Sequence, residues 1–245
     1  MCGKNGTLQR DLGDEAINVK FIQLIALTIF LFGCGETVPR TQNPGILSMG
    51  DSLLAWNSFS GHSVSDAIES NLGELVVDRS VIGAGFLYNL PISGAAGLNI
   101  AKQYRPGSWD WIILNGGGND LWFRCGCNRC DRTIERMISK DGQSGEIPNL
   151  VFRLRATGAR VIYVGYLHSP GAYSIVDRCK DEVTELESRI AILAKEEKGT
   201  YYLKLADLVP KGDLSYHDVD RIHPSIKASA EIGMLVSRII SRQRR

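Results

Sequence analysis

The sequence predicts an α/β protein whose parallel sheet is covered by helices on both faces. Short apolar runs typical of buried strands alternate with segments that carry apolar residues at helical spacing. Five such runs occur within residues 45–241, with no internal repeat. The composition, 44% hydrophobic and 22% charged, is close to the soluble globular average. The net charge of +1 argues against disorder and against a nucleic-acid partner bound through a global basic field.

The first half of this region contains two strands and two helices in alternation. Residues 45–49 form a short apolar run that ends at Gly50, which is typical of a buried strand. Residues 64–72 carry apolar side chains at helical spacing, and the valine-rich segment 74–82 is predicted to be the second strand. A second helix is predicted over residues 94–104.

The second half continues the same alternation. Residues 181–198 separate charged side chains from Leu186, Ile190 and Leu193, which predicts an amphipathic helix. Gly158 follows another periodic segment directly and is a typical helix stop signal. The predicted strands here are 109–114, 160–166 and 201–205, and the predicted helices are 147–157, 181–198 and 225–241. In such folds, ligands bind outside the carboxyl ends of the parallel strands.

The N-terminal residues are predicted to lie outside this domain. Residues 21–33 are apolar apart from a glutamine and a threonine, and Lys20 precedes them. This run is shorter than the about 20 residues of a membrane-spanning helix and suits the hydrophobic region of a signal peptide. It ends in Leu-Phe-Gly-Cys34, which resembles a bacterial lipobox and implies that Cys34 is lipidated. The alternative is a buried helix of a cytosolic domain.

These features divide the chain into three parts. Residues 1–34 are predicted to be a leader with a lipoprotein-type signal peptide, 35–44 a polar tether and 45–245 the folded domain. The leader contains three acidic residues, which suits a signal peptide poorly, and a non-AUG start at Val19 is a hypothesis that would remove them. The resemblance of the sequence around Cys34 to a lipobox implies an exported, membrane-anchored protein of the bacterial periplasm. The residue after Cys34 is Gly35 and not the aspartate that acts as an inner-membrane retention signal in enteric bacteria, which slightly favours the outer membrane.

Four cysteines remain once the leader and the lipobox are set aside. They are Cys125, Cys127, Cys130 and Cys179. An even number suits two disulfides in an oxidising compartment, and the alternative is a zinc site made of the same four thiolates. Three cysteines within six residues cannot all pair among themselves, so one must reach Cys179. The favoured pairing is Cys125–Cys130 with Cys127–Cys179, and the alternative is Cys127–Cys130 with Cys125–Cys179.

Four short motifs lie at the ends of the predicted elements. They are Gly-Asp-Ser-Leu at 50–53, Val-Ile-Gly-Ala-Gly at 81–85, Gly-Gly-Asn-Asp at 117–120 and Asp-Arg-Ile-His-Pro at 220–224. Together and in this order they resemble the sequence blocks of the SGNH hydrolases, also called the GDSL family of esterases and lipases. The resemblance extends over residues 45–241. It implies a flavodoxin-like three-layer α/β/α sandwich with a central five-stranded parallel sheet, and an esterase that needs neither a metal nor an organic cofactor.

The residue chemistry agrees with this resemblance independently. A serine hydroxyl needs an adjacent base to become a nucleophile, and Ser52 follows a strand directly, where a turn would expose its side chain. His223 is the candidate base, and Asp220 lies three residues before it, so that one turn can bring the carboxylate to the imidazole. Asp218 is the alternative orienting carboxylate. Pro224 suits the first position of the closing helix.

The family resemblance also implies which groups bind the oxyanion. In this family the donors are the N–H of the nucleophilic serine, the N–H of a glycine in the second motif and the side-chain amide of the asparagine in the third. Carried over, these are Ser52, Gly83 and Asn119. Gly85 is the alternative glycine. Asp78 stands where many members of the family have asparagine.

These observations predict an exported serine esterase that acts through an acyl-enzyme. The expected partner is a small-molecule, lipid or glycan ester, with a preference for short-to-medium acyl groups. Candidates for an acyl pocket are Trp56, Leu87, Tyr88, Trp122 and Phe123. The loop at residues 124–131 is predicted to form a disulfide-stapled wall of the active site. The alternatives are an acyltransferase that uses an alcohol in place of water, and a non-catalytic envelope lipoprotein that acts as a binding module.

Overall fold

The computed structural model describes residues 45–88, 91–169 and 174–245. The predicted leader, the lipidation site at Cys34 and the whole predicted tether therefore lie outside the described residues. Within the described ranges, no helix is both long enough and apolar enough to cross a membrane.

A parallel sheet of five strands forms the centre of the domain. The strands are β1 (Ile46–Met49), β2 (Val76–Asp78), β3 (Trp111–Leu114), β4 (Arg160–Val164) and β5 (Thr200–Leu203), in the spatial order β2-β1-β3-β4-β5. This is the order of flavodoxin-like doubly wound sheets. The predicted α/β fold class is therefore confirmed. Because the chain order reverses between β1 and β3, the carboxyl ends of these two strands are the expected place for a site.

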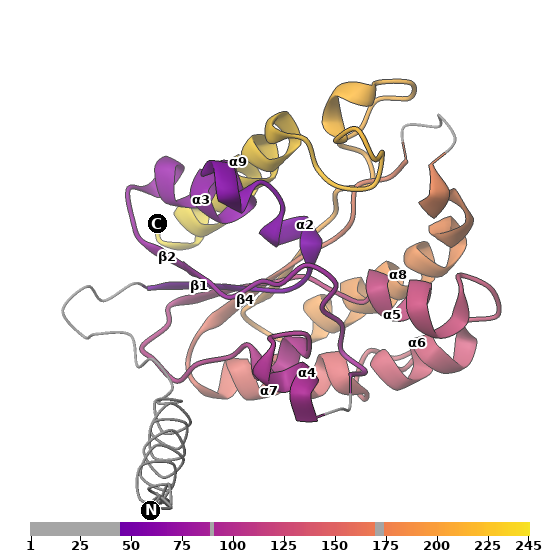
Figure 1. Ribbon diagram of the computed structural model, residues 1–245. Coiled ribbons are helices and arrows are strands. Elements are labelled where there is room, and N and C mark those ends of the chain that lie inside the picture. The colour runs from indigo at the N-terminus through magenta and orange to yellow at the C-terminus, as the bar shows by residue number, and fades with distance from the viewer. Residues whose placement is uncertain (1–44, 89–90, 170–173) are drawn as a thin grey trace, which may run out of the picture. The chain divides into compact units, whose positions relative to one another are not determined.

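Helices cover both faces of the sheet (Figure 1). One face carries α3 (Val64–Leu72) and α9 (Ile226–Gln243), which pack against each other, with the short α2 (Ser52–Ala55) beside them. The other face carries α4 (Pro91–Ala95), α5 (Gly118–Cys125), α6 (Asp131–Met137), α7 (Glu146–Ala156) and α8 (Lys180–Glu196). Apolar side chains fill the space between the first face and its helices, including Ile46, Trp111, Ile162, Ile68 and Ile232. Burial of such side chains is the main stabilising contribution to a fold of this kind.

The predicted strand 74–82 is shortened to β2 and the predicted strand 160–166 ends at Val164, and two further segments form elements other than those predicted. The predicted helix over residues 94–104 is instead the end of α4 and a separate 3-10 turn (Ile100–Lys102), because Gly97 has φ +72° and Asn99 caps the new turn. Helices α5 and α6 were not predicted, since their segment begins with glycines and contains three closely spaced cysteines. Segments of this composition are typical of loops.

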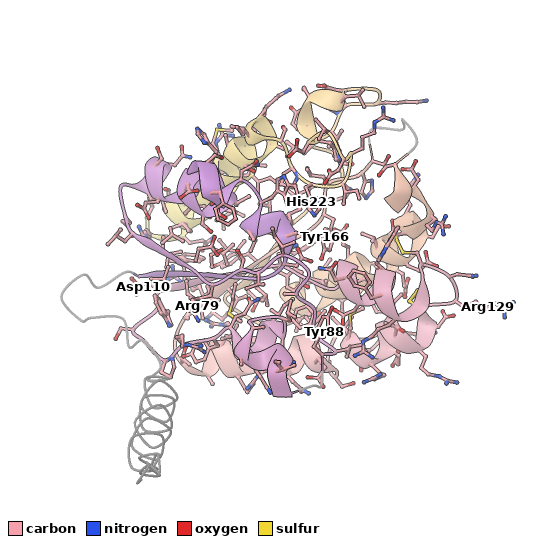
Figure 2. The ribbon with its side chains drawn as sticks, viewed as in Figure 1. Arg79, Tyr88, Asp110, Arg129, Tyr166 and His223 are labelled. Carbon is pink, nitrogen blue, oxygen red and sulfur yellow. A yellow bond between two sulfur atoms is a disulfide. The ribbon has the colours of Figure 1, made fainter. Side chains whose placement is uncertain are left out.

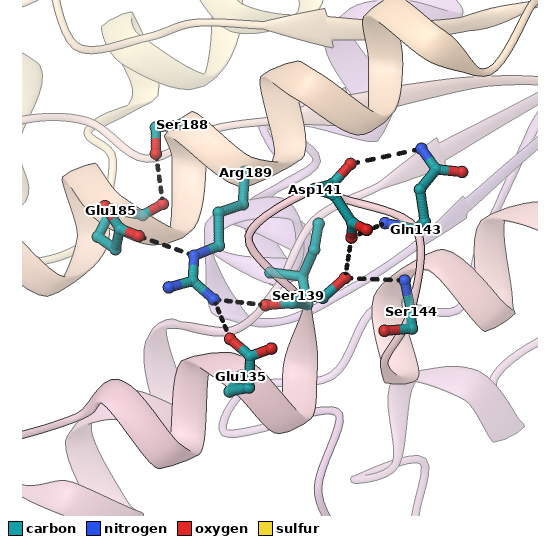
Figure 3. A network of polar contacts seen from close by, with 9 residues as sticks. Glu135, Ser139, Asp141, Gln143, Ser144, Glu185, Ser188 and Arg189 are labelled. Atoms are coloured by element: carbon teal, nitrogen blue, oxygen red, sulfur yellow. Dashed lines mark hydrogen bonds and ion pairs between the residues drawn. The ribbon is translucent and has the colours of Figure 1, made fainter.

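A buried arginine ties the cysteine-rich region to the sheet-covering helix α8 (Figure 3). Arg189 on α8 has a side chain that is 4% exposed, and it forms ion pairs with Glu185 at 2.8 Å and with Glu135 of α6 at 2.7 Å. It also donates to the carbonyl of Ile138, just past the end of α6, at 2.9 Å. The guanidinium is the buried partner, whereas the side chains of Glu135 and Glu185 are 55% and 49% exposed, so solvent partly screens both ion pairs. Arg189 therefore fixes α6 against α8.

Candidate active site

The turn after β1 places Ser52 at the start of α2. The Asp51 carboxylate caps this helix by accepting the Leu53 N–H at 3.0 Å. Gly50 is held by the buried side chain of Gln103, which accepts the Gly50 N–H at 2.7 Å and donates from Nε2 to the Gly50 carbonyl at 2.9 Å. The backbone on both sides of the turn is therefore fixed at the carboxyl end of the sheet.

The loop before α9 brings Asp220 and His223 together. Asp220 Oδ2 lies 2.5 Å from His223 Nδ1, and Asp220 Oδ1 accepts the N–H groups of Ile222 and His223. Partial burial alone would raise the pKa of Asp220, but these hydrogen bonds outweigh it and hold the pKa below its usual value. The carboxylate is therefore ionised beside the imidazole. It can bind the Nδ1 proton, which leaves Nε2 as the proton acceptor.

The face of the His223 ring is covered by Trp56. The two rings are stacked, with centroids 3.7 Å apart and planes 5° apart. The Trp56 Nε1 donates to Asp218 Oδ2 at 2.7 Å. Asp218 therefore orients the tryptophan, whereas Asp220 contacts the histidine, which distinguishes the two carboxylates that the sequence left as alternatives.

Ser52 and His223 line the same cavity of about 560 Å³. Asn119 and Tyr166 line it as well, and Figure 2 shows the positions of His223 and Tyr166. No hydrogen bond joins the Ser52 hydroxyl to His223 in the described part of the chain. Hydrogen bonds between catalytic groups are often long before substrate binds, so this geometry is compatible with a nucleophile–base pair.

Two backbone N–H groups and one side-chain amide are available as oxyanion donors. The N–H groups of Ser52 and Gly83 donate to no acceptor among the described residues, whereas the Gly85 N–H is bonded to a backbone carbonyl at 2.9 Å. The Asn119 Nδ2 donates to the carbonyl of Ala84 at 2.9 Å, which places its amide beside the second motif. An amide nitrogen carries two hydrogens, so one remains for a ligand. This geometry favours Gly83 over Gly85.

Asp120 connects the second and third motifs, a role that the sequence did not reveal. Its buried carboxylate accepts the N–H groups of Phe86 and Leu87, both at 2.8 Å. Burial raises the pKa of Asp120, although these two hydrogen bonds oppose the rise. A Cβ on Gly85 would lie 2.8 Å from this carboxylate, so glycine is needed for the close approach. Asp120 therefore positions the loop beside the Asn119 amide.

The walls of the cavity are largely apolar. They include Leu53, Trp122, Phe123, Leu167, Val183 and Ile222. Of the predicted pocket residues, Trp122 and Phe123 line this cavity, whereas Leu87 is buried in the core and Trp56 packs on His223. Phe123 is 65% exposed and lies at the rim. The cavity thus combines a polar reactive group of residues with an apolar surface suited to an acyl chain.

Two disulfides staple the segment after α5. Cys125 is bonded to Cys130 and Cys127 to Cys179, which is the pairing favoured from the sequence. All four sulfurs are therefore unable to act as zinc thiolates. Cys179 also lines the cavity, so the longer bridge joins the segment after α5 to the cavity wall. Among the described residues, no group of three or more His, Cys, Asp or Glu side chains is placed to hold a metal ion.

Removal of the longer bridge is expected to reduce both stability and activity. A Cys127→Ser/Cys179→Ser variant opens a loop with a sequence separation of 52. Bridges of this kind typically contribute about 2–4 kcal/mol to the free energy of unfolding. Urea unfolding and ester hydrolysis measure the two effects. The matched control, Cys125→Ser/Cys130→Ser, opens a loop with a separation of 5 and should change both less. Equal effects of the two variants would contradict this prediction.

Sequence reasoning missed three residues that position the site, namely Gln103, Asp120 and Tyr166. Tyr166 lies two residues after β4, but the predicted strand extends to residue 166 and includes it, so the rule that site residues follow parallel strands did not select it. Asp120 belongs to a recognised motif, but nothing in that motif indicates its backbone partners. Gln103 lies 53 residues from its partner Gly50, and no local signal connects them.

Comparisons with known proteins identify the family and the shared fold. The model of the GDSL-like lipase/acylhydrolase family matches residues 48–230. None of the curated proteins matches the chain significantly. A crystal structure of a GDSL-like lipase from Bacteroides thetaiotaomicron has a TM-score of 0.53 at 15% identity, covering 91% of this chain and 98% of that one. A lipase/acylhydrolase from Enterococcus faecalis has a TM-score of 0.53 at 17% identity, covering 81% and 95%.

A carbohydrate acetylesterase from Sinorhizobium meliloti also has a similar fold. Its TM-score is 0.50 at 17% identity, covering 81% of this chain and 98% of that chain. At such identities the solved structures show the shared fold, whereas the family model matches the sequence itself over most of its length. The chain therefore belongs to the GDSL-like lipase/acylhydrolase family and is a hydrolase that acts on ester bonds.

Proposed function

We propose that this protein hydrolyses carboxylic esters through an acyl-enzyme on Ser52. The observation that carries the proposal is that Ser52 and His223 line one cavity while Asp220 contacts His223 Nδ1. His223 Nε2 accepts the hydroxyl proton while Ser52 Oγ bonds to the ester carbon. The C–O bond to the alcohol then breaks, and His223 returns the proton to the departing alcohol. Water attacks the acyl-enzyme by the same route, which releases the acid and restores the Ser52 hydroxyl.

The negative charge that develops on the carbonyl oxygen is stabilised by three donors. These are the N–H groups of Ser52 and Gly83 and the second hydrogen of the Asn119 amide. Both N–H groups are free of other acceptors in the described chain, and the amide is held in place by Ala84. Donors that are already oriented stabilise the transition state without further reorganisation.

Covalent labelling tests this function directly. A fluorophosphonate probe should react with the wild-type protein, and peptide mapping should locate the adduct on Ser52. The same protein should hydrolyse p-nitrophenyl esters, and esterase activity without a Ser52 adduct would contradict the assignment. A binding module that has kept the fold would bind ligands but would neither react with the probe nor turn over an ester.

The cavity supports a preference for short-to-medium acyl chains. Its apolar wall includes Val183 on α8, and a larger side chain there should shorten the space available to the chain. Val183→Trp is therefore expected to lower kcat/KM for octanoyl and decanoyl p-nitrophenyl esters while leaving the acetyl ester nearly unaffected. Ile192→Trp is the matched control, because this residue lies on the same helix and is 40% exposed. An equal loss of kcat/KM for the acetyl, octanoyl and decanoyl esters would indicate that the acyl chain does not bind beside Val183.

We further propose that the protein is exported and anchored in the cell envelope through a lipid on Cys34. The support is the apolar run at 21–33 and the lipobox-like sequence that follows it. Cys34→Ser should abolish lipid attachment and processing at this site. Cys2→Ser, in the same leader, should leave fractionation unchanged. A Cys34→Ser protein that matures and fractionates like the wild type would contradict the anchor.

A further inference from the structure

The hydroxyl of Tyr166 joins two motifs that lie far apart in the sequence. It donates to Asp51 Oδ2 at 2.5 Å and accepts the N–H of Gly118 at 2.8 Å. Asp51 immediately precedes Ser52, and Gly118 immediately precedes Asn119. A single oxygen atom therefore connects the turn that carries the proposed nucleophile to the helix that carries a proposed oxyanion donor.

The position of Tyr166 is itself fixed. Its N–H donates to Oε1 of the buried Glu187 on α8 at 2.6 Å. Its ring packs closely on Gly118, because a Cβ at that position would lie 2.9 Å from the Tyr166 Cζ. Only glycine permits this approach. The hydroxyl can therefore act as a fixed link between the two motifs.

We propose that Tyr166 is a positioning residue that holds the Ser52 turn and the Asn119 helix at one fixed separation. This inference rests on the proposed function. Attack on the ester carbon and stabilisation of the oxyanion occur on adjacent atoms of the substrate, so the nucleophile and the amide must be placed together to within a fraction of an ångström. Without the hydroxyl, the two motifs lose this shared hydrogen-bond partner.

The direction of these hydrogen bonds favours an ionised Asp51. Tyrosine has one hydroxyl proton, and donating it to the carboxylate leaves the oxygen lone pairs for the Gly118 N–H. Asp51 is 1% exposed, and burial raises its pKa to about 6, although hydrogen bonds from Tyr166 and Leu53 lower it. As the pH falls through this value, the carboxyl gains its own proton and the link to Tyr166 weakens.

Other titratable groups also face Asp51. His223, in the loop before α9, lowers the pKa of Asp51, and Asp120 on α5 raises it. Tyr163 on β4 lies close enough to Asp51 that the Asp51 charge contributes to raising the pKa of Tyr163. None of these three forms a hydrogen bond with Asp51 in the described structure. A change confined to the Tyr166 hydroxyl can therefore be separated from the effects of its neighbours.

Tyr166→Phe tests the inference, because it removes the hydroxyl and keeps the ring. A displacement of about 1 Å can cost about a hundredfold in rate, so kcat for a p-nitrophenyl ester should fall by about tenfold to a hundredfold. KM should change by less than about threefold, because the cavity wall is preserved. The acid limb of the kcat/KM profile should move to higher pH, since the Asp51 carboxylate loses a hydrogen bond that favours its charged form.

Tyr163→Phe is the matched control. This tyrosine is buried, comes from β4 and donates its hydroxyl to the carbonyl of Gly116 at 2.8 Å, two residues before Gly118. It does not hydrogen-bond with Asp51. The control should lose a similar amount of thermal stability, but the acid limb of its profile should stay at the wild-type pH. A purely structural role of Tyr166 would make the two variants behave alike.

Asp51→Asn supplies a second measurement in case Tyr166→Phe does not fold. The amide oxygen can still accept the Leu53 N–H, but the group no longer titrates. Deprotonation of Asp51 should contribute to the wild-type acid limb, so the acid limb of the variant should lack this contribution and be less steep.

Two results would overturn the inference. One is a Tyr166→Phe protein whose kcat stays within about threefold of wild type. The other is an acid limb that is unchanged in both Tyr166→Phe and Asp51→Asn. A wild-type protein that neither hydrolyses esters nor reacts with a fluorophosphonate at Ser52 would overturn the proposed function instead, so the two failures are distinguishable.

Discussion

Replacement of Ser52 or His223 by alanine is expected to lower kcat on the order of 10⁴- to 10⁶-fold. The first variant loses the oxygen that bonds to the ester carbon, and the second loses the base that accepts the serine proton. Neither change should unfold the protein. The Ser52 hydroxyl makes no hydrogen bond in the described structure, and the His223 ring lies on the cavity wall. Ester hydrolysis and the thermal unfolding midpoint, measured on the same preparations, check both parts of this prediction.

The double variant gives a stricter test. Residues that act as one unit are strongly non-additive, so Ser52→Ala/His223→Ala should be hardly less active than either single variant. Ser58→Ala and His62→Ala are suitable controls, since both residues are exposed and lie close to the same turn. If both single variants kept rates near the wild type, the catalytic site would have to be sought elsewhere in the chain.

The sheet and its reactive loops could be predicted because their signals are local. Buried strands such as β3 are short apolar runs, and β3 leads directly into a glycine-rich polar motif. The spacing of Asp220 and His223 also sufficed to predict their contact, because three residues separate them. For the disulfides, spacing required one of three close cysteines to pair with Cys179 but left two pairings open, and the observed pairing is the favoured one.

The supporting contacts could not be predicted, because their partners are distant in sequence. Tyr166 lies 115 residues from Asp51, and Gln103 lies 53 residues from Gly50. Nothing in either segment indicates its partner, since tyrosine and glutamine are as common on surfaces as in buried networks. These contacts exist only once the sheet has brought its carboxyl ends together. Sequence reasoning thus located the candidate reacting groups but not the residues that hold them.

Asn119→Ala is the second large effect that we expect. Loss of one oxyanion donor costs about 10²- to 10³-fold in kcat, and KM should change little because the donor acts mainly in the transition state. The variant also loses the hydrogen bond to the Ala84 carbonyl, so part of the loss could come from displacement of the second motif. A measurement on alanine alone cannot separate the two contributions.

Asn119→Asp separates them. The carboxylate has nearly the shape of the amide, but it donates nothing and places a negative charge where the oxyanion must form, so this variant should be slower than Asn119→Ala. If positioning of Ala84 were the main role, the aspartate variant would also lose stability, because its carboxylate would face the Ala84 carbonyl oxygen, so the thermal unfolding midpoint is measured beside the rates. A loss below about tenfold in Asn119→Ala would favour that structural role. A larger loss, deeper still in an aspartate variant that keeps the unfolding midpoint of Asn119→Ala, would show that the amide contacts the developing charge.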